Sequence, residues 1–300
     1  MRLLALLQPL LALLLAPLLP GVVNRTKAFF AGRRGPPLLQ AYYDLGKLLR
    51  KGAVYSRTTT WLFRAGPLVT LAALGVALLL TPLGRLPAPL AFEGDLILFA
   101  YLLGLGRFFT VLAALDTGSS FEGMGASREV QFAVFAEPAL LLGLAALALR
   151  GGGWSLSDLL GGLTGGLPGG GPALVAAAVL IVFLAENARL PVDDPNTHLE
   201  LTMIHEVMVL DHGGVDFAFV QYGAALKLWI LGALVVGIVL PLPPGSWGLR
   251  AAVSVTGLLG LAVVVGVIES CLARLRLLRV PQLLVGAGAL AILALLVALR

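Results

Sequence analysis

Long apolar runs separated by short polar segments dominate the pattern of the chain. A transmembrane helix takes about 20 mostly apolar residues, and eight runs approach or reach that length. They are rich in Leu, Ala and Gly and lack the period-two alternation of a transmembrane β-strand. The pattern therefore predicts an all-α, polytopic membrane protein with about eight transmembrane helices, at 3–23, 65–83, 96–115, 130–149, 172–187, 217–240, 249–270 and 281–299.

Two of these runs need comment. The run at 3–23 is followed by no clean small-x-small cleavage site, so we interpret it as a membrane helix and not a signal peptide. The run at 172–187 is short. We expect its helix to begin inside the glycine-rich segment that precedes it, or to end in a cavity covered by a partner.

Composition agrees with this pattern and excludes several kinds of protein. Hydrophobic residues make up 59% of the 300 residues and charged residues 12%, against about 25% charged in a typical soluble domain. Mean hydropathy is +0.97, so a soluble particle is excluded. The single cysteine, Cys271, excludes a disulfide framework and an iron–sulfur cluster, which needs about four cysteine ligands.

Basic residues predict the orientation. Nine of them lie between the first two runs, and the loops on that side of the membrane hold fourteen, against five on the other side. The positive-inside rule then puts both termini outside a prokaryotic cytoplasmic (inner) membrane. Residues 1–300 would form one integral membrane domain. Its cytoplasmic loops would be 24–64, 116–129, 188–216 and 271–280, and the glycine-rich outer loop 150–171.

Five ionisable residues fall inside or at the ends of predicted spans. They are Arg107, Glu137, Glu186, Lys227 and Glu269. Charged groups in a bilayer are costly, which makes them candidates for function. At 1.5 Å per residue, Glu137 and Arg107 would lie roughly 10 Å deep and Lys227 roughly 15 Å. Ion pairs that only hold helices together, such as Arg107 with Glu137, are the alternative to a hydrated cavity or proton path.

The densest polar segment follows the fifth run. Glu186 and Arg189 are three residues apart and could pair on a helix. Two prolines then interrupt the helix, and Thr197 with Glu200 forms a capping box that would begin a new one. We expect this helix, at about 197–212, to lie at the membrane interface.

Three histidines lie in that helix, at His198, His205 and His212. Their spacing of seven residues, about 10 Å along a helix, is too wide for one metal ion, and no zinc-protease motif is present. We therefore expect no metal site in the chain. A polar rim or a proton-exchanging cluster fits better, because histidine titrates near neutral pH.

The segment after the third run joins charged residues with glycine and serine. Asp116, Glu122, Arg128 and Glu129 lie in it, and Ser127 is a candidate cap for the fourth helix. A solvated connecting loop is one interpretation. The other, which we favour, is close approach of the backbone to a partner or ligand, because glycine permits it.

The glycine-rich segment and the net charge carry little functional information. Residues 151–171 contain ten glycines, a composition typical of flexible linkers. A phosphate-binding loop would need a strand before it and a helix after it, so we do not interpret this segment as one. The net charge of +5 follows from topology, so we expect no nucleic-acid partner, and the absence of a clear repeat argues against an inverted-repeat transporter.

The sequence resembles the subunit 1 family of respiratory NADH dehydrogenase (complex I) over nearly its whole length. One motif is Glu186-x-x-Arg189-x-Pro191-x-Asp193-x-Pro195, and another covers the first cytoplasmic loop. The Asp-Asp-Pro-x-Thr-His-Leu-Glu stretch from Asp193 resembles the formate hydrogenlyase and hydrogenase-4 branch, and this departure argues against quinone binding. The first-loop residues are Arg33, Arg34, Gly35, Pro36, Gln40, Asp44 and Lys47.

The resemblance implies partners and roles. The chain would lie beneath hydrogenase large and small subunits on the cytoplasmic side, beside antiporter-like membrane subunits. Nickel–iron and iron–sulfur centres would belong to those partners, with no cofactor in this chain. Residues that would line a proton path or inner cavity are Arg107, Glu137, Glu186, Asp193, Asp194, Glu200, Glu206, Asp211 and Lys227. Those assigned to docking are Arg33, Arg34, Asp44, Lys47, Asp116, Glu122, Arg128, Glu129, Arg189, His198 and His205.

Three functions from different classes follow. The first is a coupling and anchoring subunit of an energy-converting nickel–iron hydrogenase. The second is a quinone-site subunit of a complex I-like NADH:quinone oxidoreductase. The third is a stand-alone ion-coupled transporter. The first two place this chain inside an oxidoreductase complex without a complete active site of its own.

Overall fold

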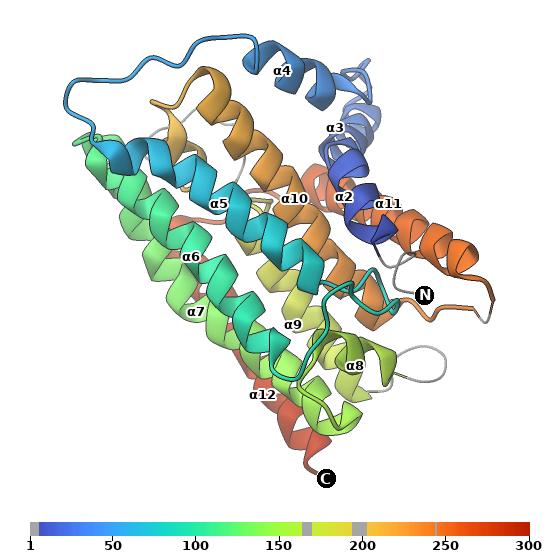
Figure 1. Cartoon of the computed structure of the whole chain (residues 1–300). Helices are drawn as coiled ribbons and strands as arrows, with labels where there is room; N and C mark the ends of the chain where they lie inside the picture. Colours follow the sequence, from blue (N-terminus) through green and yellow to red (C-terminus); the bar gives the residue numbers. More distant parts are fainter. Residues whose placement is uncertain (1–5, 164–169, 194–202, 244) are drawn as a thin grey trace.

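The computed structural model describes residues 6–163, 170–193, 203–243 and 245–300. Every named element in these ranges is a helix (Figure 1). The elements are α2 (Leu7–Leu15), α3 (Leu18–Phe30), α4 (Gln40–Leu48), α5 (Trp61–Leu80), α6 (Asp95–Asp116), α7 (Ser120–Gly151), α8 (Leu156–Gly161), α9 (Gly170–Glu186), η1 (Glu206–Val209), α10 (Gly214–Val239), α11 (Trp247–Cys271), η2 (Leu277–Arg279) and α12 (Val280–Ala298).

The eight predicted spans are present as helices, and the all-α prediction is confirmed. Within the described ranges, six helices are long and apolar enough to cross a membrane, or seven if the pair α2–α3, bent by 42°, is one span. The predicted span at 172–187 corresponds to the shorter apolar helix α9. It begins at Gly170 inside the glycine-rich segment, as the short apolar run predicted.

The bend between α2 and α3 has a local cause. Pro17 has no N–H to donate to the carbonyl of Leu13, four residues earlier. The Tyr222 hydroxyl of α10 donates to that carbonyl instead, at 2.8 Å. A side chain from a neighbouring helix thus satisfies a group that the break leaves without its helical partner, as an apolar environment requires.

Helix α10 forms the centre of the bundle. In its apolar window 78% of the residues are buried, compared with 22% in α6 and 28% for the span that ends in α12. Figure 1 shows α10 between α5 and α6 on one side and α2, α3 and α11 on the other. Helices α7, α9 and α12 pack together and complete the bundle. The outer helices keep apolar faces exposed, as expected of a protein surrounded by lipid.

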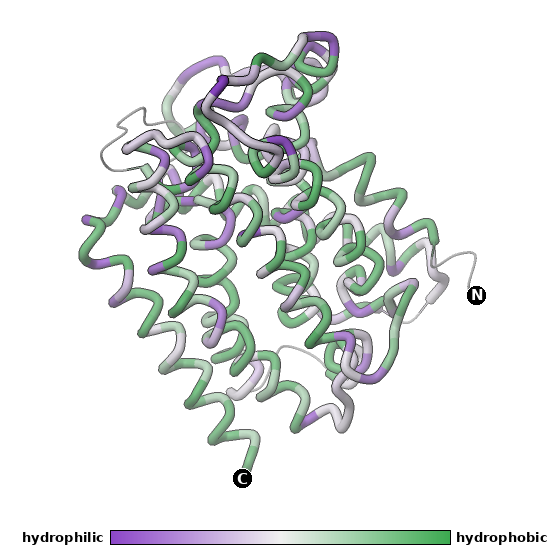
Figure 2. Tube along the Cα trace, turned by 60° about the vertical axis from the view of Figure 1, so that its left-hand side comes forward, coloured by the Kyte–Doolittle hydropathy of each residue, from purple (hydrophilic) through white to green (hydrophobic). Residues whose placement is uncertain are grey.

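Polar residues gather at one end of the bundle, where α3, α6, α9 and α11 end and α5, α7, α10 and α12 begin. We call this the charged end. Figure 2 shows hydrophilic positions concentrated there and hydrophobic ones over the remainder. Helix α4 lies at this end and buries none of its residues. Arg33 and Arg34 before it are exposed as well.

The segment 116–129 is not the loop that the sequence suggested. Helix α6 continues to Asp116 and α7 already begins at Ser120. Ser127 therefore lies inside α7 and caps nothing. The Asp116 carboxylate accepts hydrogen bonds from the backbone N–H groups of Thr60 (2.6 Å) and Phe63 (3.3 Å). It completes the N-terminus of α5, where unpaired N–H groups attract an anion.

Two other segments also differ from expectation. Residues 197–202 of the expected interfacial helix lie outside the described residues. The part at 203–212 contains only the short 3₁₀ helix η1, and it packs into the bundle with Ile204 and Val207 fully buried. Gly125 of α7 permits this contact, since a Cβ there would lie 2.3 Å from a methyl group of Val207. In the glycine-rich segment, α8 buries Leu156 completely, so this part is packed and not a free linker.

A pair of glycines in α5 gives a matched test of this packing. A Cβ on Gly66 would lie 2.7 Å from that of Ala113 on α6, whereas one on Gly75 would meet nothing within 4 Å. We expect Gly66→Ala to lower the free energy of unfolding by about 1–3 kcal/mol through overpacking. Gly75→Ala should leave it unchanged or raise it by up to about 1 kcal/mol. Unfolding of the detergent-solubilised protein measures both, and equal stability of the two variants would contradict the α5–α6 contact.

Candidate functional site

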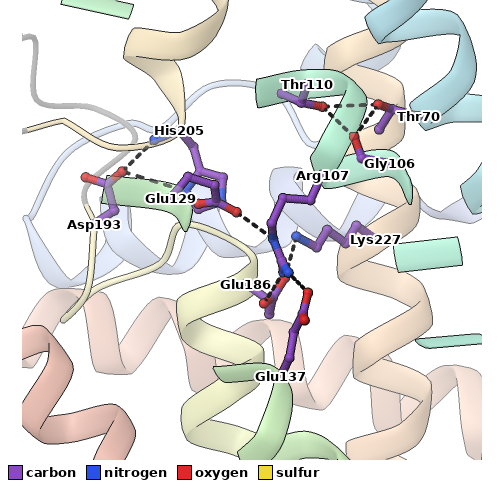
Figure 3. A network of polar contacts seen from close by, with 10 residues as sticks. All are labelled: Thr70, Gly106, Arg107, Thr110, Glu129, Glu137, Glu186, Asp193, His205 and Lys227. Atoms are coloured by element: carbon purple, nitrogen blue, oxygen red, sulfur yellow. Dashed lines mark hydrogen bonds and ion pairs between the residues drawn. The ribbon is translucent and has the colours of Figure 1, made fainter. Parts of the chain in front are cut away.

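Charged side chains from four helices meet inside the bundle. The guanidinium of Arg107 on α6 contacts three carboxylates through three different nitrogen atoms (Figure 3). Nε lies 3.0 Å from Glu129 of α7, Nη1 contacts Glu137 of α7, and Nη2 contacts Glu186 at the end of α9. Lys227 of α10 lies 2.7 Å from the second oxygen of Glu186. We call these five residues the intramembrane ionic network.

The chemistry of arginine accounts for this arrangement. A guanidinium is planar, stays charged and offers five N–H donors, so it can serve several carboxylates at once. The side chains of Arg107, Glu129 and Glu186 are only 7–9% exposed. Buried charges are tolerated only when they are paired and hydrogen-bonded. The pairing of Arg107 with Glu137 considered from the sequence is therefore real, and it is one contact of three.

His205 connects the network to the charged end of the bundle. Its Nε2 lies 3.1 Å from Glu129. Its backbone N–H donates to Asp193 at 3.3 Å, and the neighbouring N–H of Ile204 donates to the same carboxylate at 3.1 Å. Asp193 also pairs with Arg274 at 2.8 Å. A continuous set of polar contacts thus extends from Asp193 through His205 and Glu129 to the network.

The pairing of Arg189 with Glu186 that the sequence suggested was wrong. Arg189 pairs with Glu269 of α11 at 3.4 Å, and Glu269 also contacts Lys27 of α3 at 2.8 Å. The reason is that α9 ends at Glu186, so the helical spacing of three residues no longer applies. Ala188 then takes a left-handed φ of 49° and turns the chain away. Glu269 accordingly belongs to a second ion cluster, separate from the intramembrane ionic network.

A third polar group surrounds His212 at the N-terminus of α10. Its ring stacks on that of Phe63, with centroids 3.9 Å apart and planes inclined by 14°. Burial lowers the pKa of His212, against the opposing effect of the Asp216 and Asp211 carboxylates. The backbone N–H of Asp211 donates to the buried Glu122 at 3.1 Å. The stacking of His212 on Phe63 could not be predicted from the sequence, because aromatic stacking between distant segments leaves no local pattern.

Some of the residues assigned to docking are exposed, and others are buried. Arg33, Arg34 and Lys47 are exposed. In contrast, Glu122 and Glu129 are only 1% and 6% exposed, so these two do not form a docking surface. The absence of proline between 117 and 137 could have indicated that α7 begins early enough to carry both inward.

The remaining candidates are placed as follows. Gln40 donates to the half-buried Asp44 at 2.9 Å, and Arg128 donates to the Met203 carbonyl at 2.8 Å. Asp211 is exposed and Glu206 is half-buried. The candidates Asp194, His198 and Glu200 lie outside the described residues.

The charged residues of this site are joined by ion pairs. Among the described residues, no group of three or more His, Cys, Asp or Glu side chains is placed to hold a metal ion. The carboxylates of Glu129, Glu137 and Glu186 share one guanidinium. Protonation of one of them changes the electrostatic energy of the others, so such groups titrate as a unit.

Comparison with known proteins places the chain in a family. The sequence profile described as NADH dehydrogenase matches residues 2–299. The chain belongs to the NADH dehydrogenase family. Among its relatives, formate hydrogenlyase subunit 4 of Escherichia coli (strain K12) is 32% identical over 292 residues, covering 93% of this chain and 92% of that protein. Hydrogenase-4 component C of the same strain is 34% identical over 240 residues, covering 79% and 75%.

The fold of this NADH dehydrogenase family member also has a counterpart among solved structures. A chain in the membrane-bound sulfane sulfur reductase, an archaeal respiratory membrane complex, superposes with a TM-score of 0.85. The match covers 99% of this chain and 98% of the other at 23% identity. At that identity the likeness establishes the fold. Together with the helices, the family relationship confirms a multi-pass membrane protein of the complex I subunit 1 type.

The buried His212 predicts a pH dependence of stability. Because its pKa in the folded protein lies below 6.5, the unfolded chain takes up a proton first as the pH falls through 6.5. This contribution to stability is therefore complete above that pH and is lost below it. We expect His212→Phe, which keeps the stack on Phe63 and cannot titrate, to remove this part of the acid sensitivity. Thermal unfolding from pH 8 to about pH 5 tests it, and identical profiles would contradict the assignment.

Proposed function

We propose that the chain is the membrane-embedded coupling and anchoring subunit of a multisubunit, energy-converting nickel–iron hydrogenase of the formate hydrogenlyase type. It would link a redox reaction on the cytoplasmic side to ion translocation. The observation that carries this proposal is the intramembrane ionic network and its connection through His205 to the charged end. The names of the two relatives in Escherichia coli support the choice of complex.

The network has the properties that coupling requires. The polar contacts that lead to it begin where Asp193 anchors the backbone of His205, and the network reaches Glu137, seven residues into the apolar stretch that starts at 130. A charge or proton change at the polar end can therefore alter the electrostatic energy of groups roughly 10 Å inside the membrane. The contact of His205 with Glu129 supports this proposal, because it joins the network to the charged end of the bundle.

The charged end offers a surface for partner subunits. Exposed apolar side chains lie there next to basic ones, with Phe29 80%, Tyr43 62% and Val54 84% exposed. A large apolar patch rimmed by charges is typical of a protein interface. The excess of basic residues at this end supports a cytoplasmic orientation. Hydrogenase large and small subunits would dock here, and they would hold the nickel–iron and iron–sulfur centres, since one cysteine cannot ligate a cluster.

Removing charge from the network should uncouple the complex. We expect Glu186→Gln and Glu137→Gln to lower hydrogen turnover or ion pumping by roughly 100-fold, the lower end of what a lost proton-transferring group costs. The complex should still assemble. Glu93→Gln is the matched control, because this carboxylate is exposed at the opposite end and accepts from the Trp154 N–H. Turnover and pumping at the parental level in both network variants would reduce the network to a structural role.

Substitutions at the charged end, where partner subunits would dock, should have a different effect. We expect Arg34→Ala and Asp44→Ala to reduce the amount of nickel-containing subunits that copurify in mild detergent, several-fold for each variant. Arg300→Ala removes an exposed arginine at the other end and should retain them. A complex that purifies intact without nickel would refute the hydrogenase assignment. Quinone-dependent activity in that complex would favour the complex I-like alternative.

A further inference from the structure

The side chain of Glu137 is half exposed, and a charged side chain exposed to lipid carries a large energetic cost. Its side chain is 49% exposed, whereas those of Arg107 and Glu186, which it lies beside, are 9% and 7% exposed. It lies roughly 10 Å from the polar end of the apolar stretch at 130–149. A carboxylate that faced hydrocarbon at this depth would be strongly unfavourable. Its exposed side must therefore meet something other than lipid.

A second polar feature lies on the same face of α7. Pro138 follows Glu137 and has no N–H, so it gives no helical hydrogen bond to the carbonyl of Val134. Val134 is 62% exposed, and Val130 and Leu141 beside it are 48% and 40% exposed. In a membrane, a backbone carbonyl that loses its helical donor requires another donor. The face formed by Val130, Val134, Glu137, Pro138 and Leu141 is thus apolar at its margins, with a carboxylate and a proline at its centre.

The charges of the network indicate which chemistry would cover this face. Three carboxylates contact two cations, Arg107 and Lys227, so the five residues of the network, when ionised, carry one more negative than positive charge. Figure 3 shows Glu137 at one side of this group, reaching toward Arg107. An added donor, cationic or neutral, would offset the excess at its exposed member.

We infer that this face of α7 is the contact surface for a transmembrane helix of another membrane subunit, which brings a hydrogen-bond donor to Glu137. The inference rests on the proposed function in one respect, namely that the chain works inside a membrane complex. A second copy of this chain is disfavoured, because a two-fold contact centred here would place two Glu137 carboxylates against each other. Lipid is disfavoured by the exposed carboxylate and the Val134 carbonyl.

Photo-cross-linking in the intact complex tests the inference. Benzoylphenylalanine is placed at Val134 or at Leu141, and for comparison at Val264, which is 46% exposed. Val264 belongs to α11, a helix on the opposite side of the bundle from α7 (Figure 1). After illumination of native membranes, we expect adducts with a different, membrane-embedded polypeptide from the α7 positions, at least several-fold above those from Val264. Two exposed α7 positions guard against a local folding defect at either one.

Each other outcome of the cross-linking has a definite meaning. An adduct of twice the mass of this chain would identify a second copy and overturn the inference. Adducts with lipid alone, or equal yields at Val264, would also overturn it. Metal analysis of the same preparation separates this result from the proposed function. A cross-linked membrane partner in a complex without nickel would keep the interface and refute the hydrogenase.

A bulky substitution provides an independent measurement. Val134→Trp should displace the partner helix, so that the polypeptide found by cross-linking is lost several-fold from the purified complex. Val264→Trp should retain it. Both positions are exposed, so neither change overpacks the interior of this chain. Retention of the partner in both variants, at equal amounts, would overturn the inference.

Discussion

The shared guanidinium of Arg107 is the contact on which the interior depends. An arginine inside an apolar bundle is stable only if anionic partners surround it. Here the partners come from α7 and α9, and Lys227 of α10 joins through Glu186. The four helices must therefore keep their relative rotation and depth, because a displaced carboxylate would leave a buried charge unpaired. The network specifies one packing among the many that apolar surfaces alone would allow.

The same constraint explains the asymmetry between the two ends of the molecule. The carboxylates stay charged only where cations and polar backbone can reach them, and these lie toward the charged end, where Asp193 fixes the backbone of His205. At the opposite end, backbone carbonyls and serine hydroxyls satisfy the few polar groups. Arg85 there donates to the Gly237 carbonyl at 3.1 Å, and Asp95 accepts from Ser155 at 2.8 Å. Ion pairs between side chains are thus concentrated toward one end, whereas backbone groups and hydroxyls satisfy polar side chains at the other.

The intramembrane ionic network is only partly enclosed by the chain. Glu129 and Glu186 are buried, whereas Glu137 is half exposed on an outer helix. Groups that share one cation respond to each other's protonation, and an exposed member extends this response to the surface of the chain. This partial enclosure is the feature of the network on which the proposed coupling role depends.

The sequence alone predicted the helical spans and placed Arg107, Glu137, Glu186 and Lys227 within or at the ends of them, because hydrophobic length and the cost of charge in lipid are local properties. The tertiary structure decided which charged side chains pair with each other. Arg189 pairs with Glu269 and not with Glu186, since α9 ends between them. Glu129 turns inward because α7 begins ten residues earlier than its apolar pattern. Pairings between distant helices depend on their rotation and depth, and a one-dimensional pattern contains neither.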